Sequence, residues 1–299
     1  MLNIIGKKKI YFILSILLIG AALYAIAFYG LRQGIDFKGG TLWEITIPQQ
    51  KPAAAALEGK IGGVSSLKDI RINEDAQGNF FLRLPAISEK EHQTYLVELS
   101  KEYPSLQELS FASIGPSVGA ELRRKALLAM VLVLIGISLY IAYAFRKASY
   151  PVSSWKYGWV TLLTLFHDVV IPAGLLAFLG HIRGVEIDSN FVVALLVVMG
   201  FSVHDTIVVF DRIRENVVLR GHKEQFETVV NESVNQTLAR SINTSLTLIL
   251  VLLALYFAGP AALHYFVLTL LVGVTTGIYS SIFIASPLLV VFKGRSIRE

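Results

Sequence analysis

The chain has 299 residues, of which 54% are hydrophobic and only 16% are charged. Soluble domains carry about 25% charged residues, so the composition argues against a soluble globular protein and favours a membrane protein. The absence of cysteine excludes disulfides, thiolate catalysis and thiolate metal sites.

Six apolar stretches are long enough for helices that cross a bilayer, which takes about 20 apolar residues. No segments of about 10 residues alternate in hydrophobicity, so a β-barrel is not expected. The first stretch follows Lys7–Lys9 as in a signal peptide, but it exceeds the usual apolar region of such peptides, and we expect it to remain as a helix. The stretches lie at residues 10–29, 126–145, 158–180, 190–210, 241–258 and 265–292.

Cations in the short connections indicate orientation, because cytoplasmic loops carry an excess of Lys and Arg. On one side of the membrane, the sequence places Lys7–Lys9, Arg146, Lys147, Lys156, Arg212, Arg214, Arg220, Lys223, Lys293, Arg295 and Arg298. The short loops on the other side hold Arg183 alone. The sequence therefore predicts that both termini are cytoplasmic. The net charge of +5 reflects this topology and does not indicate nucleic-acid binding.

Residues 31–122, between the first two apolar stretches, are expected to form a small extracytoplasmic α+β domain, with 1–30 and 123–299 forming the membrane part. Its pattern predicts βαββαβ, the ferredoxin-like order. The segments in order are "TLWEITI", "KPAAAALEGKI" from near Pro52, "LKDIRIN" and "NFFLRLP" around "EDAQG", "SEKEHQTYLVELSKEYP", and "LQELSFASIG". Ser88 and Glu91 form a capping-box pattern. His92, among acidic residues, is expected to lie in solvent.

The fourth apolar stretch, "VVMGFSVHDTIVVFDRIREN", carries His204 and Asp205 in its interior. Asp205 lies six residues before Asp211, about 9 Å inside the boundary. A charge at the bilayer centre costs at least ~2.5–3.5 kcal/mol and usually has a partner. The fifth stretch offers one in Arg240, within a polar stripe spaced at three and four residues. The stripe comprises Gln236, Arg240, Asn243, Thr244 and Thr247.

Two arrangements of Asp205 and Arg240 fit these residues. In the first, the pair is a fixed salt bridge between two helices, and His204 donates to a backbone carbonyl. In the second, Asp205 takes up and releases a proton. Burial favours a neutral carboxyl group, whereas a nearby guanidinium favours the carboxylate. A motion that separates the pair would therefore change the protonation of Asp205.

The third stretch contains His167 and Asp168, about 15 Å inside the membrane. Hydrogen bonding between helices is the simpler interpretation, and a place in an ion relay is the other. A catalytic or metal-binding role is disfavoured by the lack of an HExxH motif. Pro172 and Gly174 are expected to loosen this helix. "GVTTG" (Gly273–Gly277) predicts close packing of helices.

Several stretches together resemble the SecF family, the smaller of the paired SecD/SecF subunits of bacterial protein export. These are "GIDFKGGTLWEI", "IGPSVGAEL", "GFSVHDTIVVFDRIREN", "NESVNQTLARSINTSLT" and "YSSIFIASPL", and they cover nearly the whole chain. Many family members have Asn at the position of His204.

The resemblance implies a six-span half of an assembly related to proton-driven efflux pumps of the RND superfamily. The implied partners are a six-span SecD-like subunit, the SecYEG channel, the SecA motor and the translocating preprotein; no cofactor, metal or enzymatic activity is implied. A proton or sodium gradient would drive late steps of export. Asp205 and Arg240 match the residues that the family uses in proton movement. The surrounding candidates are His204, Asn243, Thr244, Thr247, His167 and Asp168.

The same resemblance marks two junctions of the domain as candidate hinges or tight turns, at Asp36, Gly39, Gly40, Gly115, Pro116 and Gly119. Glycine permits bends there, and Asp36 is expected to tie the first junction by hydrogen bonds. The alternative function is an RND-like exporter of small molecules or ions. Such exporters usually carry twelve spans in one chain, whereas this chain has six.

Overall fold

The computed structural model describes residues 1–49, 52–64, 70–74, 78–146, 152–220 and 224–293. The chain divides into two compact units, residues 1–32 with 128–299 and residues 33–127. The centre of the predicted "EDAQG" turn (75–77) lies outside the described residues. The same holds for four of the cations used to predict orientation, Lys147, Lys223, Arg295 and Arg298.

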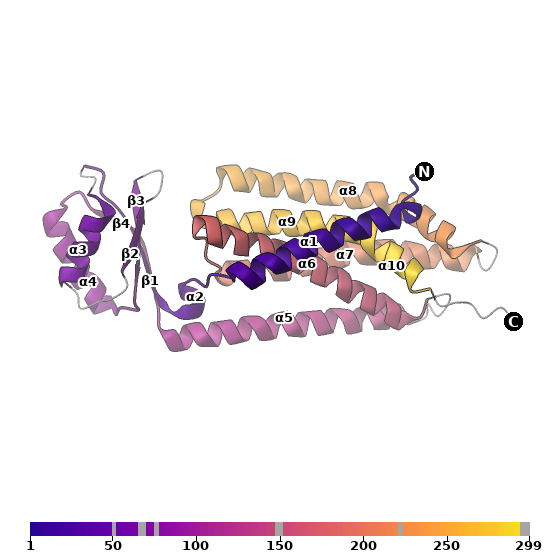
Figure 1. Ribbon diagram of the computed structural model, residues 1–299, viewed down its shortest axis with the longest axis horizontal. Coiled ribbons are helices and arrows are strands. Elements are labelled where there is room, and N and C mark those ends of the chain that lie inside the picture. The colour runs from indigo at the N-terminus through magenta and orange to yellow at the C-terminus, as the bar shows by residue number, and fades with distance from the viewer. Residues whose placement is uncertain (50–51, 65–69, 75–77, 147–151, 221–223, 294–299) are drawn as a thin grey trace. The chain divides into compact units, whose positions relative to one another are not determined.

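The first unit is a bundle of long helices (Figure 1). Six segments of the described chain are long and apolar enough to cross a membrane, which confirms the predicted polytopic helical fold. Its elements are η1 (Ile5–Lys7), α1 (Lys8–Tyr29), α5 (Pro116–Ala144), α6 (Ser154–Arg183), α7 (Ser189–Arg220), α8 (Phe226–Ala258), η3 (Ala261–Leu263), α9 (His264–Ser280), the π-helical turn η4 (Ser281–Ala285) and α10 (Ser286–Val291).

The helices extend beyond their apolar stretches because amphipathic segments continue them. Before the fifth stretch, α8 already begins at Phe226, and Val229, Val230 and Val234 are buried along its first turns. Within the bundle, the share of buried residues in the most apolar window is 56% for α6, α7 and the α9–α10 segment, but 17% for α1 and α8 and 6% for α5. The first three therefore form the centre, and the others lie around them.

Glycines allow the central helices to approach closely. A Cβ atom on Gly273 of α9 would lie 2.2 Å from Val198 of α7, and one on Gly277 would lie 3.1 Å from Ser202. These two contacts, four residues apart on each helix, confirm the close packing predicted for "GVTTG".

Gly174 brings α1 against α6. A Cβ atom there would lie 2.4 Å from the Cα of Ala22, and α6 continues without a break through Pro172. The predicted role of Gly174 in loosening the helix is thus replaced by a packing role, because backbone of α1 occupies the space of the missing side chain.

Replacing Gly174 with Ala should lower the free energy of unfolding by about 1–3 kcal/mol, the usual effect of overpacking. Gly20→Ala in α1 is the matched control, because nothing lies within 4 Å of a Cβ atom at Gly20. This control should be neutral or stabilising by up to ~1 kcal/mol. Thermal unfolding in detergent measures both, and equal melting of the two variants would contradict the packing role.

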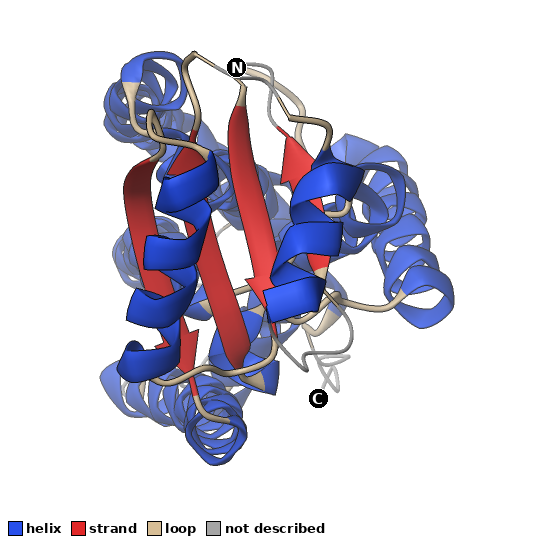
Figure 2. Cartoon of the chain, turned by 90° about the vertical axis from the view of Figure 1, so that its left-hand side faces the viewer, coloured by secondary structure: helices blue, strands red, loops and turns tan. Residues whose placement is uncertain are grey.

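The second unit is a four-stranded antiparallel sheet in the order β2-β3-β1-β4. Figure 2 shows its two longer helices lying across one face of the sheet. The observed βαββαβ order confirms the predicted ferredoxin-like arrangement, although α3 begins at Ala54 and not at Pro52. The elements are α2 (Ile35–Lys38), β1 (Gly40–Thr46), α3 (Ala54–Val64), β2 (Arg71–Glu74), β3 (Asn79–Leu84), α4 (Glu89–Glu102) and β4 (Gln107–Ile114).

His92 is buried, and the prediction that it lies in solvent is wrong. Only 2% of the His92 surface is exposed. Its Nε2 lies 2.7 Å from Glu108 Oε2, and its ring stacks on the ring of Phe111 with 3.6 Å between the ring centres. Glu89, on the same helix, lies 3.3 Å from Nδ1. The sequence showed only the acidic neighbours on α4, whereas β4 supplies both the aromatic ring and the second carboxylate.

The predicted capping box at the start of α4 is confirmed. The Ser88 amide donates to Glu91 Oε2 at 2.7 Å, and the Glu91 amide donates to Ser88 Oγ at 3.4 Å. The hydrogen bonds from the Ser88 backbone and side chain lower the pKa of Glu91. A carboxylate whose pKa is lower in the folded state stabilises the fold above the unfolded pKa, which is about 4.3 for Glu. This stabilisation is lost as the pH falls through the folded pKa.

We therefore expect the melting temperature of this unit to fall less between pH 7 and pH 3 in Glu91→Gln than in the wild type. Trp43 fluorescence, measured with Trp155 and Trp159 replaced by Phe, reports on the unit. Glu58→Gln, at an exposed position of α3, should keep the wild-type pH dependence. A Glu91→Gln variant with the same pH dependence as the wild type would contradict the expectation.

Candidate ion-relay site

Asp205 lies on α7 and is only 6% exposed. Its neighbours Ser202 and Thr206 are buried as well. Ser241 of α8 and Ser281 of η4 lie beside the carboxyl group. One carboxyl oxygen, Oδ2, is buried without a hydrogen-bond partner among the described residues. An acidic oxygen with unused hydrogen-bonding capacity thus lies inside the bundle.

A cavity of about 440 Å³ lies beside Asp205. It is lined by Phe201, His204, Asp205, Val208, Arg240 and Thr244. Four predicted site residues, from α7 and α8, therefore meet at one cavity. A single water needs only about 10–15 Å³ of such space, so the cavity has room for several. Because His204 and Arg240 are exposed, the cavity is open to the surface of this chain.

Arg240 and Asp205 both line this cavity. Both belong to the described part of the chain, and neither an ion pair nor a hydrogen bond joins them. In this conformation the acid and the base are therefore not paired. His204 also lines the cavity, and no hydrogen bond connects it to another described residue.

A second cavity, of about 260 Å³, continues from the first along α7 and α8. It shares Val208 and Arg240 with the first and is otherwise lined by Asp211, Arg212, Glu215, Gln236 and Thr237. Arg212 donates to Gln236 at 2.6 Å and to Glu215 at 2.6 Å. From Asp205 to Glu215, α7 rises about 15 Å. The two cavities together outline a polar route from Asp205 towards the end of α7.

The sequence analysis uses Arg212 only to predict topology and does not single out Glu215. The pattern that indicates both residues is a spacing of three and four, which places Asp205, Val208, Arg212 and Glu215 on one helix face.

The remaining predicted residues of α8 lie outside the first cavity. Asn243 and Thr247 are exposed, and the Thr247 hydroxyl donates to the Thr244 carbonyl at 2.7 Å. The five residues that we call the polar stripe, Gln236, Arg240, Asn243, Thr244 and Thr247, are all exposed. A membrane-spanning helix thus presents a polar face on the outside of the bundle.

His167 and Asp168 belong to a separate buried network. Asp168 is fully buried and accepts hydrogen bonds from Ser202 of α7 at 2.5 Å and Ser280 of α9 at 2.7 Å. Its other oxygen lies 2.8 Å from His167 Nδ1, and His167 Nε2 is buried without a partner among the described residues. Asp168 therefore ties three helices together.

Hydroxyl groups connect the surroundings of the two acids. Thr206 Oγ1 lies 2.8 Å from Ser281 Oγ, and Ser281 donates to the Ser202 carbonyl at 3.4 Å. Sequence reasoning missed these hydroxyls and Ser280, although "YSSIFIASPL" was singled out. Ser280 donates to Asp168, whereas Ser281, the first residue of the π-helical turn, lies beside Asp205. No periodicity in the sequence indicates that these adjacent serines contact different acidic residues.

The junction glycines serve close backbone contact within residues 33–127. Gly39 (φ 77°) and Gly40 (φ 129°) occupy conformations that side chains rarely adopt. A Cβ atom on Gly39 would lie 2.7 Å from the Cα of Pro116, and one on Gly119 would lie 2.8 Å from the Gly39 amide nitrogen. Nothing lies within 4 Å of a Cβ atom at Gly115, and Asp36 lies in the first turn of α2.

Comparison with known proteins identifies the family. Residues 95–295 match the family described as protein export membrane protein SecD/SecF, C-terminal, and residues 24–46 match the SecD/SecF GG motif, which includes Asp36, Gly39 and Gly40. The chain is 44% identical to protein translocase subunit SecF of Thermobaculum terrenum, covering 99% of this chain and 95% of that protein.

The fold matches a solved structure as well. The crystal structure of SecDF from Thermus thermophilus, described as a translocon-associated membrane protein, superimposes with a TM-score of 0.82 at 34% identity. The match covers 98% of this chain but only 39% of the SecDF chain. The full-length match to SecF proteins, the GG motif and this superposition agree, and the chain belongs to the SecF family of protein translocase subunits.

Proposed function

We propose that this chain works as one half of an ion-driven assembly that promotes late steps of protein export across the cytoplasmic membrane. A six-span SecD-like subunit supplies the other half, and the assembly acts with the SecYEG channel, the SecA motor and the emerging preprotein. The similarity to a longer SecDF chain supports a SecD-like partner. The cation distribution of the sequence supports cytoplasmic termini and an extracytoplasmic α+β unit.

One observation carries this proposal: the cavity beside buried Asp205 reaches the exposed polar stripe of α8. Polar side chains within a membrane usually face protein or water-filled space. A second membrane protein therefore covers the stripe in our account, and the cavity of Asp205 and Arg240 becomes enclosed between the two subunits, as in transporters with paired halves.

The coupling follows from the separation of Asp205 and Arg240. When the helices bring Arg240 against Asp205, the carboxylate is favoured; when they part, the neutral acid is favoured. Ions moving through the two cavities would thus bias the helix arrangement, and the α+β unit, connected through α1 and α5, would move with it. A bound ion can shift the equilibrium between the two helix arrangements only if it binds one arrangement more tightly than the other.

Crosslinking tests the partner. The chain has no native cysteine, so single-cysteine variants report on one position each. Asn243→Cys, in the polar stripe, should crosslink to a co-expressed SecD-like subunit in membranes. Ile242→Cys, which is exposed but lies about 100° around the helix from Asn243 and away from the stripe, should not. If both variants crosslink equally, or if Asn243→Cys captures only a second copy of this chain, the proposed interface is wrong.

A further inference from the structure

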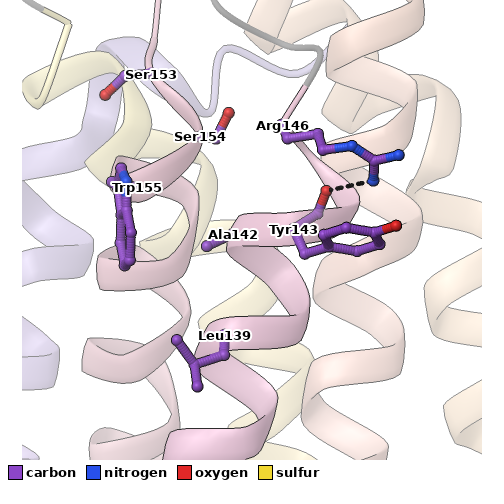
Figure 3. A pocket seen from close by; sticks show the side chains of 7 residues that line it. All are labelled: Leu139, Ala142, Tyr143, Arg146, Ser153, Ser154 and Trp155. Atoms are coloured by element: carbon purple, nitrogen blue, oxygen red, sulfur yellow. Dashed lines mark hydrogen bonds between the residues drawn. The ribbon is translucent and has the colours of Figure 1, made fainter.

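Beyond the ion-relay site, the structure contains a pocket of about 510 Å³ between the end of α5 and the start of α6. Its volume is within the range of about 300–1,000 Å³ typical of ligand sites. The lining residues are Leu139, Ala142, Tyr143, Arg146, Ser153, Ser154 and Trp155 (Figure 3). They include one cationic side chain and no carboxylate. The pocket shares no residue with the cavities beside Asp205.

Polarity changes in one direction along the pocket. Leu139 and Tyr143 lie on one face of α5, and Arg146 follows two residues after the end of the helix. From Leu139 to the last residue of α5, Ala144, the helix rises about 8 Å. Figure 3 shows Leu139 at one end of the pocket, Tyr143 between, and Arg146 at the other end, with its guanidinium over the Tyr143 ring and turned away from Ser153. The lining thus passes from apolar through aromatic to cationic, the order of a membrane–water boundary.

The same face of α5 continues as an apolar strip towards the middle of the membrane. Leu128, Leu132 and Ile135 precede Leu139 at intervals of four, three and four residues, and all four are more than half exposed. From Ala144, the last residue of α5, to Ile135 the distance along the helix is about 14 Å. This is about half of the ~30 Å hydrocarbon core, the depth of one leaflet.

Aromatic residues place the pocket at the membrane boundary. The chain has three tryptophans, and the two in the helix bundle, Trp155 and Trp159, are both on α6 near the pocket, 66% and 60% exposed. Tryptophan and tyrosine are enriched at this level of membrane proteins because one end of the ring system is apolar and the other is wet.

Two interactions orient the Arg146 side chain, and some of its N–H groups have no partner among the described residues. Its guanidinium lies over the Tyr143 ring at 3.9 Å, and Nη1 donates to the Tyr143 carbonyl at 3.1 Å. A guanidinium has five N–H donors arranged to bind phosphate, and Arg146 makes no ion pair with another described residue. Ser153 is exposed and makes no capping hydrogen bond at the start of α6.

We propose that this pocket binds the phosphate headgroup of an anionic phospholipid. Arg146 holds the phosphate, and Tyr143 and Trp155 flank the glycerol region. One acyl chain follows the apolar strip of α5. A soluble anion would need no such strip, and a protein segment would not require the apolar-to-cationic gradient across one leaflet. The site is independent of Asp205 and of the proposed function.

Native mass spectrometry of the purified full chain tests the proposal with phosphatidylglycerol and phosphatidylcholine as probes. The wild type should retain phosphatidylglycerol preferentially. Arg146→Gln should weaken that binding about fivefold, the effect of one cation near an anionic lipid surface. Lys9→Gln removes the same charge from an exposed position of α1 outside the pocket and should leave binding unchanged. Arg146 is exposed, so its replacement should leave the melting temperature unchanged.

Three results would overturn the proposal. Equal weakening by Arg146→Gln and Lys9→Gln would indicate general surface attraction. Equal retention of the two lipids would show that the pocket does not distinguish between their headgroup charges. Displacement of phosphatidylglycerol by inorganic phosphate at the same concentration would show a site for free anions and not for lipid.

Discussion

Asp205→Asn will abolish the stimulation of protein export by an ion gradient and leave assembly with the partner subunit intact. Asn has the shape of Asp but cannot take up or release a proton, so the cavity keeps its volume while the acid is lost. Asp205 Oδ2 has no hydrogen-bond partner among the described residues, so little packing depends on the charge. We expect gradient-dependent export to fall to the level measured without a gradient, in vesicles containing the full translocase.

Glu227→Gln is the control for this experiment. It removes a carboxylate from α8, outside both cavities, where the side chain is 56% exposed and pairs with Lys8 at 3.6 Å. An exposed pair of this kind contributes about 0–1 kcal/mol, and export should respond normally to the gradient. Loss of assembly in Asp205→Asn would instead support the static bridge, and a normal gradient response in that variant would exclude a relay through Asp205.

Asp168→Ala should have the largest effect on stability of the changes considered. It removes the acceptor for Ser202 and Ser280 and the partner of His167, which leaves buried donors without partners. Each unsatisfied buried group costs about 1–3 kcal/mol, and breaking a buried ionic cluster costs about 3–5 kcal/mol. We expect the free energy of unfolding to fall by about 3–5 kcal/mol, measured by thermal or denaturant unfolding in detergent.

Asp168→Asn keeps the size of the side chain and one acceptor and should fall between Asp168→Ala and the wild type. Asp211→Ala, at an exposed position on the neighbouring helix, should change stability by less than about 1 kcal/mol. A stable Asp168→Ala protein that no longer responds to an ion gradient would contradict the structural role and place Asp168 in the relay.

The sequence predicts the fold well where local patterns determine it. Six apolar stretches predict six spanning segments, and the capping box at Ser88 and Glu91 marks the start of α4 correctly. The amphipathic segment "GHKEQFETVVNESVNQTL" likewise predicts a surface helix that leads into the fifth stretch. The helix is present, since α8 begins at Phe226, but Val229, Val230 and Val234 are buried and not on the surface. The prediction that His92 lies in solvent is wrong for a related reason, because its burial depends on Glu108 and Phe111 of β4, which follows α4 in the sequence.

The candidate site divides in the same way. The spacing of Arg240 and Thr244, together with the buried position of Asp205, follows from helical periodicity. The separation of Arg240 from Asp205 does not, because it depends on how far apart α7 and α8 lie. The hydroxyl groups of Ser280 and Ser281 escape prediction because their partners, Asp168 and Thr206, come from two other helices.

The central claim is that the Asp205 carboxyl group changes protonation as the assembly works. Infrared difference spectroscopy on vesicles containing this chain and its SecD-like partner, recorded as a gradient is imposed, follows the carbonyl stretch of protonated carboxylic acids. The account predicts a gradient-dependent band in the wild type and in Glu227→Gln that is missing in Asp205→Asn. An undiminished band in Asp205→Asn would contradict it.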